Sequence, residues 1–128
     1  MKKSRLLTLL VLFVGLSATT ACSQSSDVDL LINILNIEQG DTVADIGAGD
    51  GDQTIGIARH LGPDGQIYST ELGTQRLETL RKNIEQTQVN NVEIIEGAPN
   101  ATNLPNECCS AVYMRRVYHH IDDPATFN

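Results

Sequence analysis

Apolar residues recur at two spacings along the chain, and these spacings predict helices that alternate with strands. A first helix begins near Asp27 or Asp29 and should end before Gly40. Strands are predicted over residues 42–46, 66–70, 92–95 and 108–118, and further helices over 54–61 and 74–86, with Thr74 as the N-cap of the latter. The order is a helix, three strands separated by helices, and then a fourth strand.

This alternation predicts an α/β fold. Strands joined by helical crossovers are parallel and their connections are right-handed, so we expect an open, mainly parallel sheet with helices on both faces. In such sheets ligands bind at the carboxyl ends of the strands. Gly47, Glu71, Gly97 and Arg115 all fall near predicted strand ends, which makes that edge the candidate site.

The first 21 residues have a different pattern, which predicts a signal peptide. Lys2, Lys3 and Arg5 precede a mostly apolar stretch over 6–16, and small residues follow over 17–21. The stretch is shorter than the roughly 20 apolar residues that span a bilayer. We therefore expect export to the periplasm or cell envelope of a bacterium.

Cys22 follows this segment directly, in a context that resembles a bacterial lipoprotein processing site. Thr19 stands where a leucine is usual, so lipidation of Cys22 and simple cleavage both remain open. Lipidation would attach the protein to a membrane. The 107 residues that follow position 21 suffice for a single small core. Residues 22–28 are then a polar tether, and 29–128 belong to one domain.

The charge balance narrows the range of partners. The whole chain has a formal net charge of −7, and removing the three cations of the signal segment lowers it to −10. Such an acidic domain repels phosphate backbones, and its only pairs of adjacent cations are Arg81–Lys82 and Arg115–Arg116. These observations argue against a nucleic-acid partner and favour a small-molecule substrate.

The most informative motif is VADIGAGDG, over residues 43–51, in which three alternate glycines directly follow the first predicted strand. Its glycines allow a turn with positive φ and a close approach to a ligand. A dinucleotide fingerprint needs a glycine where Asp52 stands, which disfavours an NAD-dependent oxidoreductase. Asp45, Asp50 and Asp52 would also repel a pyrophosphate, whereas they suit a cofactor with a cationic centre.

With this motif the chain resembles a class I S-adenosylmethionine-dependent methyltransferase, over about residues 30–124. The resemblance implies a Rossmann-like fold with S-adenosylmethionine as cofactor. It places the amino-acid portion of the cofactor against Gly47, Ala48, Gly49 and Gly51, and its ammonium near Asp45. It further implies that Glu71 binds the ribose hydroxyls, Leu72 the adenine ring, Asn100 or Ala98 the adenine edge, and that Arg115 lies where the fourth strand meets the methyl-transfer centre.

Methyl transfer mainly requires alignment, so a dedicated base is optional. His119 and His120 are the candidates for a base or a substrate contact; the alternative is that they are loop histidines capping a helix near Asp122 and Asp123. No metal site is predicted, because adjacent histidines rarely point at one ion.

Cys108 and Cys109 are consecutive residues of the predicted fourth strand. Side chains alternate across a strand, so we expect one buried and one exposed thiol, without a bond between them.

The length leaves two functional hypotheses. The family that the chain resembles has a sheet of seven strands, of which four are recognisable here. We therefore expect the fifth to seventh strands to be missing and the chain to be a fragment of a small-molecule methyltransferase. The alternative is a non-catalytic envelope lipoprotein module that binds S-adenosylmethionine or a related nucleoside. Binding without turnover would favour the module.

Overall fold

The computed structural model of the protein describes residues 26–127. The predicted signal peptide over 1–21, Cys22 and most of the tether lie outside the described residues, so export and lipidation stay predictions. Within 26–127, no helix combines the length and the apolar character that crossing a membrane requires.

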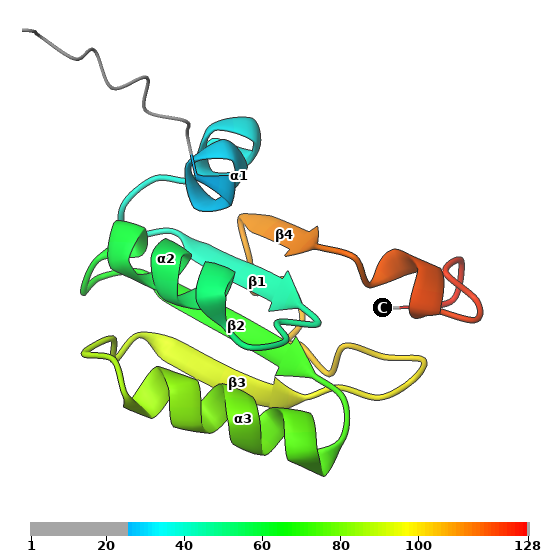
Figure 1. Ribbon diagram of the computed structural model, residues 1–128. Coiled ribbons are helices and arrows are strands. Elements are labelled where there is room, and N and C mark those ends of the chain that lie inside the picture. The colour runs from blue at the N-terminus through cyan, green and yellow to red at the C-terminus, as the bar shows by residue number, and fades with distance from the viewer. Residues whose placement is uncertain (1–25, 128) are drawn as a thin grey trace, which may run out of the picture.

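Three helices and four strands alternate almost as the sequence predicts (Figure 1). In chain order they are α1 (Asp27–Leu35), β1 (Thr42–Ile46), α2 (Asp52–Leu61), β2 (Gln66–Glu71), α3 (Thr74–Glu85), β3 (Val92–Glu96) and β4 (Ala111–Met114), followed by the 3-10 turn η1 (Tyr118–His120). Ser26 caps α1 in a reciprocal capping box with Asp29. The N-cap of α3 differs from the prediction. Gly73, with a φ of 81°, takes that position, and Thr74 is already helical.

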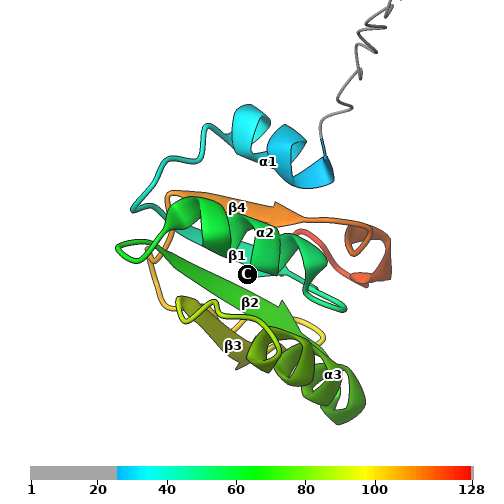
Figure 2. The ribbon, with the colours of Figure 1, turned by 60° about the vertical axis from the view of Figure 1, so that its left-hand side comes forward.

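The four strands form one parallel sheet in the order β3-β2-β1-β4, which confirms the predicted fold class (Figure 2). Ala44 at the centre of β1 is aligned with Tyr68 of β2 and Val112 of β4. The strand order reverses between β1 and β4, because β1, β2 and β3 follow one another outward and β4 returns to the other side of β1. Such a reversal is the usual place for a ligand in an open α/β sheet.

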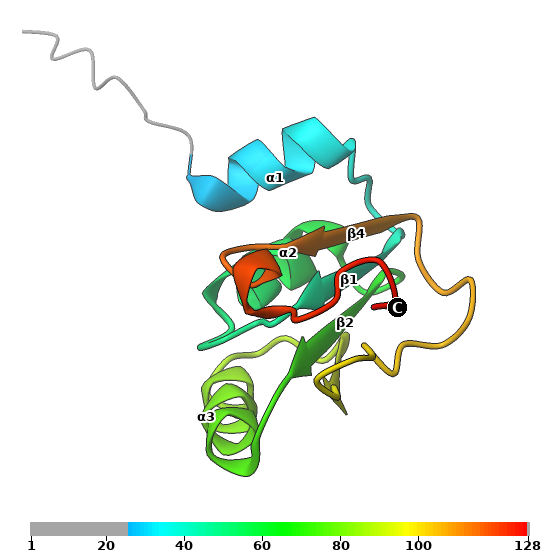
Figure 3. The ribbon, with the colours of Figure 1, turned by 90° about the vertical axis from the view of Figure 1, so that its right-hand side faces the viewer.

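The helices of the described residues gather on one face of the sheet, whereas the sequence predicted helices on both (Figure 3). Successive right-handed crossovers from β1 to β2 and from β2 to β3 run in the same direction, so α2 and α3 fall on the same side. The return from β3 to β4 runs the other way and belongs on the opposite face, where a loop takes the place of a helix. α1 packs beside α2, with Val28 against Gly56.

The core lies between this helical face and the sheet. One cluster of buried side chains joins β1, β2, α2 and β4 and consists of Ile37, Val43, Ile57, Ala58, Leu61, Ile67 and Tyr113. Leu77, Leu80 and Ile84 of α3 are also buried, as the helical spacing predicts. Burial of this kind contributes about 25 cal/mol for each Å² of apolar surface removed from water, and it holds the carboxyl ends of β1 and β2 in place.

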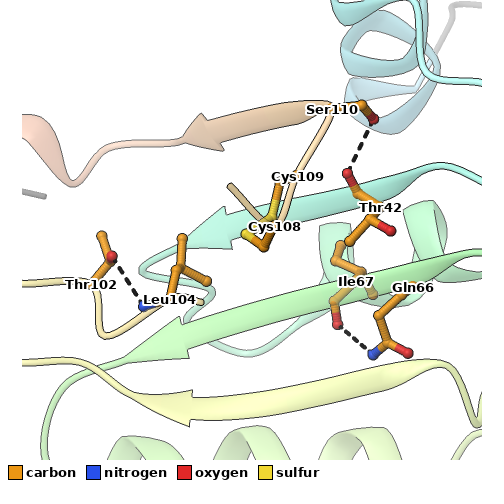
Figure 4. The surroundings of a disulfide bond; sticks show 8 residues. All are labelled: Thr42, Gln66, Ile67, Thr102, Leu104, Cys108, Cys109 and Ser110. Carbon is orange, nitrogen blue, oxygen red and sulfur yellow. Dashed lines mark hydrogen bonds between the residues drawn. A yellow bond between two sulfur atoms is a disulfide. The ribbon is translucent and has the colours of Figure 1, made fainter. Parts of the chain in front are cut away.

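The segment before β4 corrects two predictions. The fourth strand has only four residues, Ala111–Met114, instead of the predicted eleven. Cys108 and Cys109 precede it and are joined by a disulfide, with their Cα atoms 3.7 Å apart (Figure 4). Neighbouring side chains diverge in a strand, which is why the sequence predicts two unbonded thiols here. The two cysteines lie in an irregular loop, so that assumption does not apply.

Candidate functional site

The main cavity lies at the carboxyl ends of all four strands and has a volume of about 360 Å³. It spans the point where the strand order reverses, and its size falls in the range of small-molecule sites. Its walls come from the ends of β1 (Ile46, Gly47), β2 (Thr70, Glu71, Leu72), β3 (Gly97, Ala98, Pro99) and β4 (Arg115, Arg116, Val117), together with Arg76, Ala101, Thr102, His120, Ile121, Asp122 and Phe127.

The glycine loop after β1 is anchored to the end of β2. The backbone N–H groups of Gly47 and Ala48 both donate to the carbonyl oxygen of Thr70, each at 2.9 Å. Gly47, Gly49 and Gly51 have φ angles of 72°, 57° and 87°, a region that favours glycine over residues with a Cβ. The alternating glycines therefore allow a tight turn that stays in contact with the neighbouring strand.

The three glycines face different surroundings. A Cβ on Gly47 would lie 2.3 Å from Cγ2 of Val117, and one on Gly51 would lie 2.7 Å from Cδ1 of Leu80. A Cβ on Gly49 would meet nothing within 4 Å. Gly47 thus makes room for the segment after β4 and Gly51 for α3. Gly49 alone of the three borders open space.

Glu71 connects this loop to the cavity. Its side chain is buried, with 4% of the residue exposed, and yet it lines the cavity wall. Oε2 accepts the N–H of Gly49 at 2.7 Å, and Oε1 accepts the N–H of Leu72 at 2.8 Å. A carboxylate has about four lone-pair sites, so each oxygen can still accept one further hydrogen bond. Two such acceptors on one rigid group suit a pair of neighbouring ribose hydroxyls.

Asp45 lies beneath the loop and does not line the cavity. Only 2% of it is exposed, and its Oδ2 accepts the hydroxyl of Thr54 of α2 at 2.7 Å. Burial raises the pKa of Asp45 to about 6, although the bond from Thr54 opposes this rise. The hydroxyl of Tyr113 faces the same carboxyl but has no hydrogen bond of normal geometry. Burial and the charge of Asp45 raise the pKa of this phenol, so it stays neutral.

The structure brings some of the predicted site residues together and leaves others apart. Gly47, Glu71, Leu72, Arg115 and His120 line the main cavity, whereas Asp45, Ala48, Gly51, Asn100 and His119 do not. Gly49 lines a neighbouring hollow with Asp50, Gln75, Arg76 and Thr79. Ala98, the alternative to Asn100, lies in the main cavity wall. The roles assigned to these residues stay predictions.

Several cavity residues were not expected from the sequence. The sequence predicts a strand that continues through Arg116 and Val117, but β4 ends at Met114 and the chain then turns over the glycine loop. Arg76 comes from the first turn of α3, and its Nη1 lies 3.8 Å from Oε1 of Glu71. Nothing in the local pattern marks Arg76, although its distance of five residues from Glu71 places it just beyond a strand end.

His119 and His120 belong to the turn η1, with their rings 4.0 Å apart between centroids. Only His120 reaches the cavity wall. Among residues 26–127, no group of three or more histidine, cysteine or acidic side chains is arranged to hold a metal ion.

Comparison with known proteins identifies the family. Residues 43–127 match the sequence profile of the methyltransferase domain family. The chain is 31% identical over 71 residues to a demethylmenaquinone methyltransferase of a Geobacillus species, covering 56% of this chain and 30% of that protein. It is also 31% identical over 70 residues to a protein-L-isoaspartate O-methyltransferase of Methanothrix thermoacetophila, covering 55% and 33%. The chain thus spans about a third of the length of these relatives.

A solved structure shares the fold. The crystal structure of a SAM-dependent methyltransferase from Aquifex aeolicus superimposes with a TM-score of 0.71 at 20% identity, over 77% of this chain and 52% of that one. The profile match extends from β1 to beyond η1 and so includes the cavity. This chain belongs to the methyltransferase domain family, and S-adenosylmethionine is the cofactor that this membership implies.

Proposed function

We propose that the protein is the cofactor-binding part of an S-adenosylmethionine-dependent methyltransferase that acts on a small-molecule acceptor. The observation that carries the proposal is the placement of Glu71. Its buried carboxylate lines the cavity and at the same time bonds the glycine loop through the N–H of Gly49, at 2.7 Å. A cofactor bound to Glu71 would therefore also lie beside the loop.

The cavity offers matching groups for each end of the nucleoside. The free lone pairs of Glu71 accept the two ribose hydroxyls. Leu72 is 44% exposed and lines the same wall, which gives the adenine ring an apolar surface. Gly97 lies next to it, and a Cβ there would approach Cδ2 of Leu72 to 3.5 Å. The amino-acid portion then extends toward Gly47 and Gly49.

Methyl transfer depends mainly on the positions of the methyl group and the acceptor relative to each other. When bound, S-adenosylmethionine supplies an electrophilic methyl group on a sulfonium centre. Holding the acceptor in line with this group can contribute several orders of magnitude to the rate without a catalytic base. His120 lines the cavity wall and His119 does not, which supports His120 rather than His119 as the residue that accepts a proton from the acceptor.

Two observations support a small acceptor. The cavity of about 360 Å³ must hold both the cofactor and the acceptor's reacting group, and the acidic chain has few cations with which to bind a nucleic acid. The chain spans about a third of the length of its curated relatives. We therefore propose that turnover also requires residues beyond these 128. A reading frame that continues past codon 128 and encodes further strands would support this part, and a stop codon there would contradict it.

Export and lipid anchoring belong to the same proposal. The cations, apolar stretch and small residues of 1–21, followed by Cys22, support them. A palmitate analogue should label the wild-type chain in growing cells and should not label Cys22→Ser. A fusion of the chain to alkaline phosphatase should be active, as it is outside the cytoplasm. An unlabelled wild-type chain would contradict lipidation, and an inactive fusion would contradict export.

Calorimetric titration of the full chain with S-adenosylhomocysteine tests the cofactor site. We expect saturable binding that Glu71→Gln weakens at least tenfold, because the amide presents one acceptor oxygen where the carboxylate presents two. Glu78→Gln is the matched control, since Glu78 lies exposed on α3 outside the cavity. Equal affinity of the two variants would refute the assignment of Glu71, and a folded wild-type chain that does not bind would refute the function.

A further inference from the structure

The main cavity concentrates positive charge in an acidic domain. Beyond residue 21 the chain has six lysines and arginines against sixteen acidic residues. Three of those six cations, Arg76, Arg115 and Arg116, line the cavity, where only two of the acids, Glu71 and Asp122, accompany them. The cavity wall therefore has a formal charge of +1 in a domain of −10. A cavity of opposite sign to its surroundings attracts anions locally.

The three arginines differ in the ion pairs that they form within the protein. Arg115 forms an ion pair with Asp27 at the start of α1. Arg76 lies 3.8 Å from Glu71 and also lines the hollow beside Gly49. Arg116 has no ion-pair partner among residues 26–127. Arg116 is thus the one arginine of the cavity wall that is available to a ligand without loss of an ion pair within residues 26–127.

The backbone conformation of Arg116 also supports a role in ligand binding. Its φ is 61°, in the left-handed region that residues with a Cβ rarely adopt. Val117, the next residue, packs against Gly47 and fixes the path of the chain at this point. Backbone conformations of this kind persist where tertiary contacts impose them, and they are frequent at ligand sites. The turn brings Arg116 to the same wall as His120.

We propose that the methyl acceptor is an anion, a small molecule with a carboxylate or phosphate group, and that Arg116 binds this group. The inference rests on the proposed function and adds the charge of the substrate to it. A guanidinium group binds carboxylate and phosphate through two parallel N–H donors, which fixes orientation as well as charge. Arg116 would then act as a positioning and specificity-determining residue beside the methyl-transfer centre.

The cofactor also has an anionic group, because its amino-acid portion ends in a carboxylate. This carboxylate is a second potential partner for Arg116. Arg76 lies nearer to that portion, since it shares the hollow that Gly49 borders. Arg116 follows β4 on the opposite side of β1 from β2. We therefore assign Arg116 to the acceptor, and the experiment separates the two sources.

The test uses the full chain saturated with S-adenosylhomocysteine and titrated with benzoate and phenyl phosphate, with benzyl alcohol as the neutral probe. We expect the wild type to bind at least one of the two anions more tightly than benzyl alcohol. Arg116→Ala should weaken anion binding at least tenfold, and Arg116→Lys should recover part of the loss. Arg81→Ala is the matched control, since it removes the same charge from an exposed site on α3.

The outcomes are distinguishable. Equal anion binding by Arg116→Ala and Arg81→Ala, with unchanged thermal unfolding, would overturn the inference, as would a wild type that binds neither anion. A tenfold loss of affinity for S-adenosylhomocysteine in Arg116→Ala, without loss for 5′-methylthioadenosine, would assign Arg116 to the cofactor carboxylate and also overturn it. Failure of the wild type to bind S-adenosylhomocysteine would instead refute the proposed function, on which the inference depends.

Discussion

The carboxyl ends of β1 and β2 and the segment after β3 form two adjoining walls of one cavity but are built differently. In β1, residues 43–46 are all buried, and the following loop is bonded to Thr70. After β3, residues 97–127 contain only a four-residue strand and a short turn, with positive φ angles at Asn103, Glu107 and Arg116. The regular wall carries Glu71, which suits the ribose of a nucleoside, and the irregular wall carries Arg116 and His120, which suit an acceptor.

Gly47→Ala should break this arrangement most severely, because Gly47 is where the two walls touch. The new Cβ would lie 2.3 Å from Cγ2 of Val117 at a φ of 72°. Left-handed backbone strain and overpacking together cost about 4 kcal/mol. Urea unfolding followed by circular dichroism measures this loss, and affinity for S-adenosylhomocysteine should fall at least a hundredfold.

Gly40→Ala is the matched control for that variant. Gly40 also has a positive φ, 86°, but a Cβ there meets nothing within 4 Å and lies outside the cavity. It should cost only about 1 kcal/mol, from backbone strain alone. If both variants lost the same stability, Val117 would not pack on the glycine loop as described.

The variant Asp45→Asn tests the structure of the regular wall through the pH dependence of the unfolding free energy. The pKa of Asp45 is raised from 3.8 to about 6 in the folded chain, so between these values the folded state holds a proton that the unfolded state has lost. The stabilisation by the protonated carboxyl is complete below about pH 4 and is lost as pH rises through about 6, by about 3 kcal/mol.

This loss should appear as a difference between the wild type and Asp45→Asn, because the amide does not titrate. Unfolding free energies of both proteins measured between pH 4 and pH 7 isolate the contribution of Asp45. A difference that stays constant over this range would mean that the carboxyl ionises as readily in the folded state as in the unfolded state.

The contrast between the walls also explains what could be predicted from the sequence. The bounds of β1 follow from its apolar residues and the glycines after it, because both signals are local. Glu71 was found because it directly follows the predicted strand over 66–70, where the resembling family has an acidic residue. The disulfide, the short β4 and the turn at Arg116 were missed, since packing against distant residues such as Gly47 sets that path. The burial of Asp45 beneath the loop was missed for the same reason, because it depends on Thr54 of α2.

The disulfide of Cys108 and Cys109 should have the smallest effect on the cofactor. It precedes β4, neither cysteine lines the cavity, and Ser110 beside it bonds the carbonyl of Thr42 at the start of β1 (Figure 4). A bond between adjacent residues closes a minimal loop and restricts the unfolded chain little. The double variant Cys108→Ser, Cys109→Ser should keep its affinity for S-adenosylhomocysteine within twofold.

Alkylation without reductant, followed by mass spectrometry, should leave these two cysteines unlabelled in the wild type. Labelling of both would show that the thiols are free. A tenfold change of cofactor affinity in the double variant would mean that the disulfide loop shapes the cavity, although neither cysteine lines it.

The central claim is that the regular wall binds the cofactor, and amide chemical shifts test it most directly. Titration of the ¹⁵N-labelled full chain with S-adenosylhomocysteine should move the amide signals of Gly49 and Leu72 most, because both N–H groups donate to Glu71. The signals of residues 106–110 should stay in place. Unmoved signals of Gly49 and Leu72 in a folded, saturated chain would contradict the account.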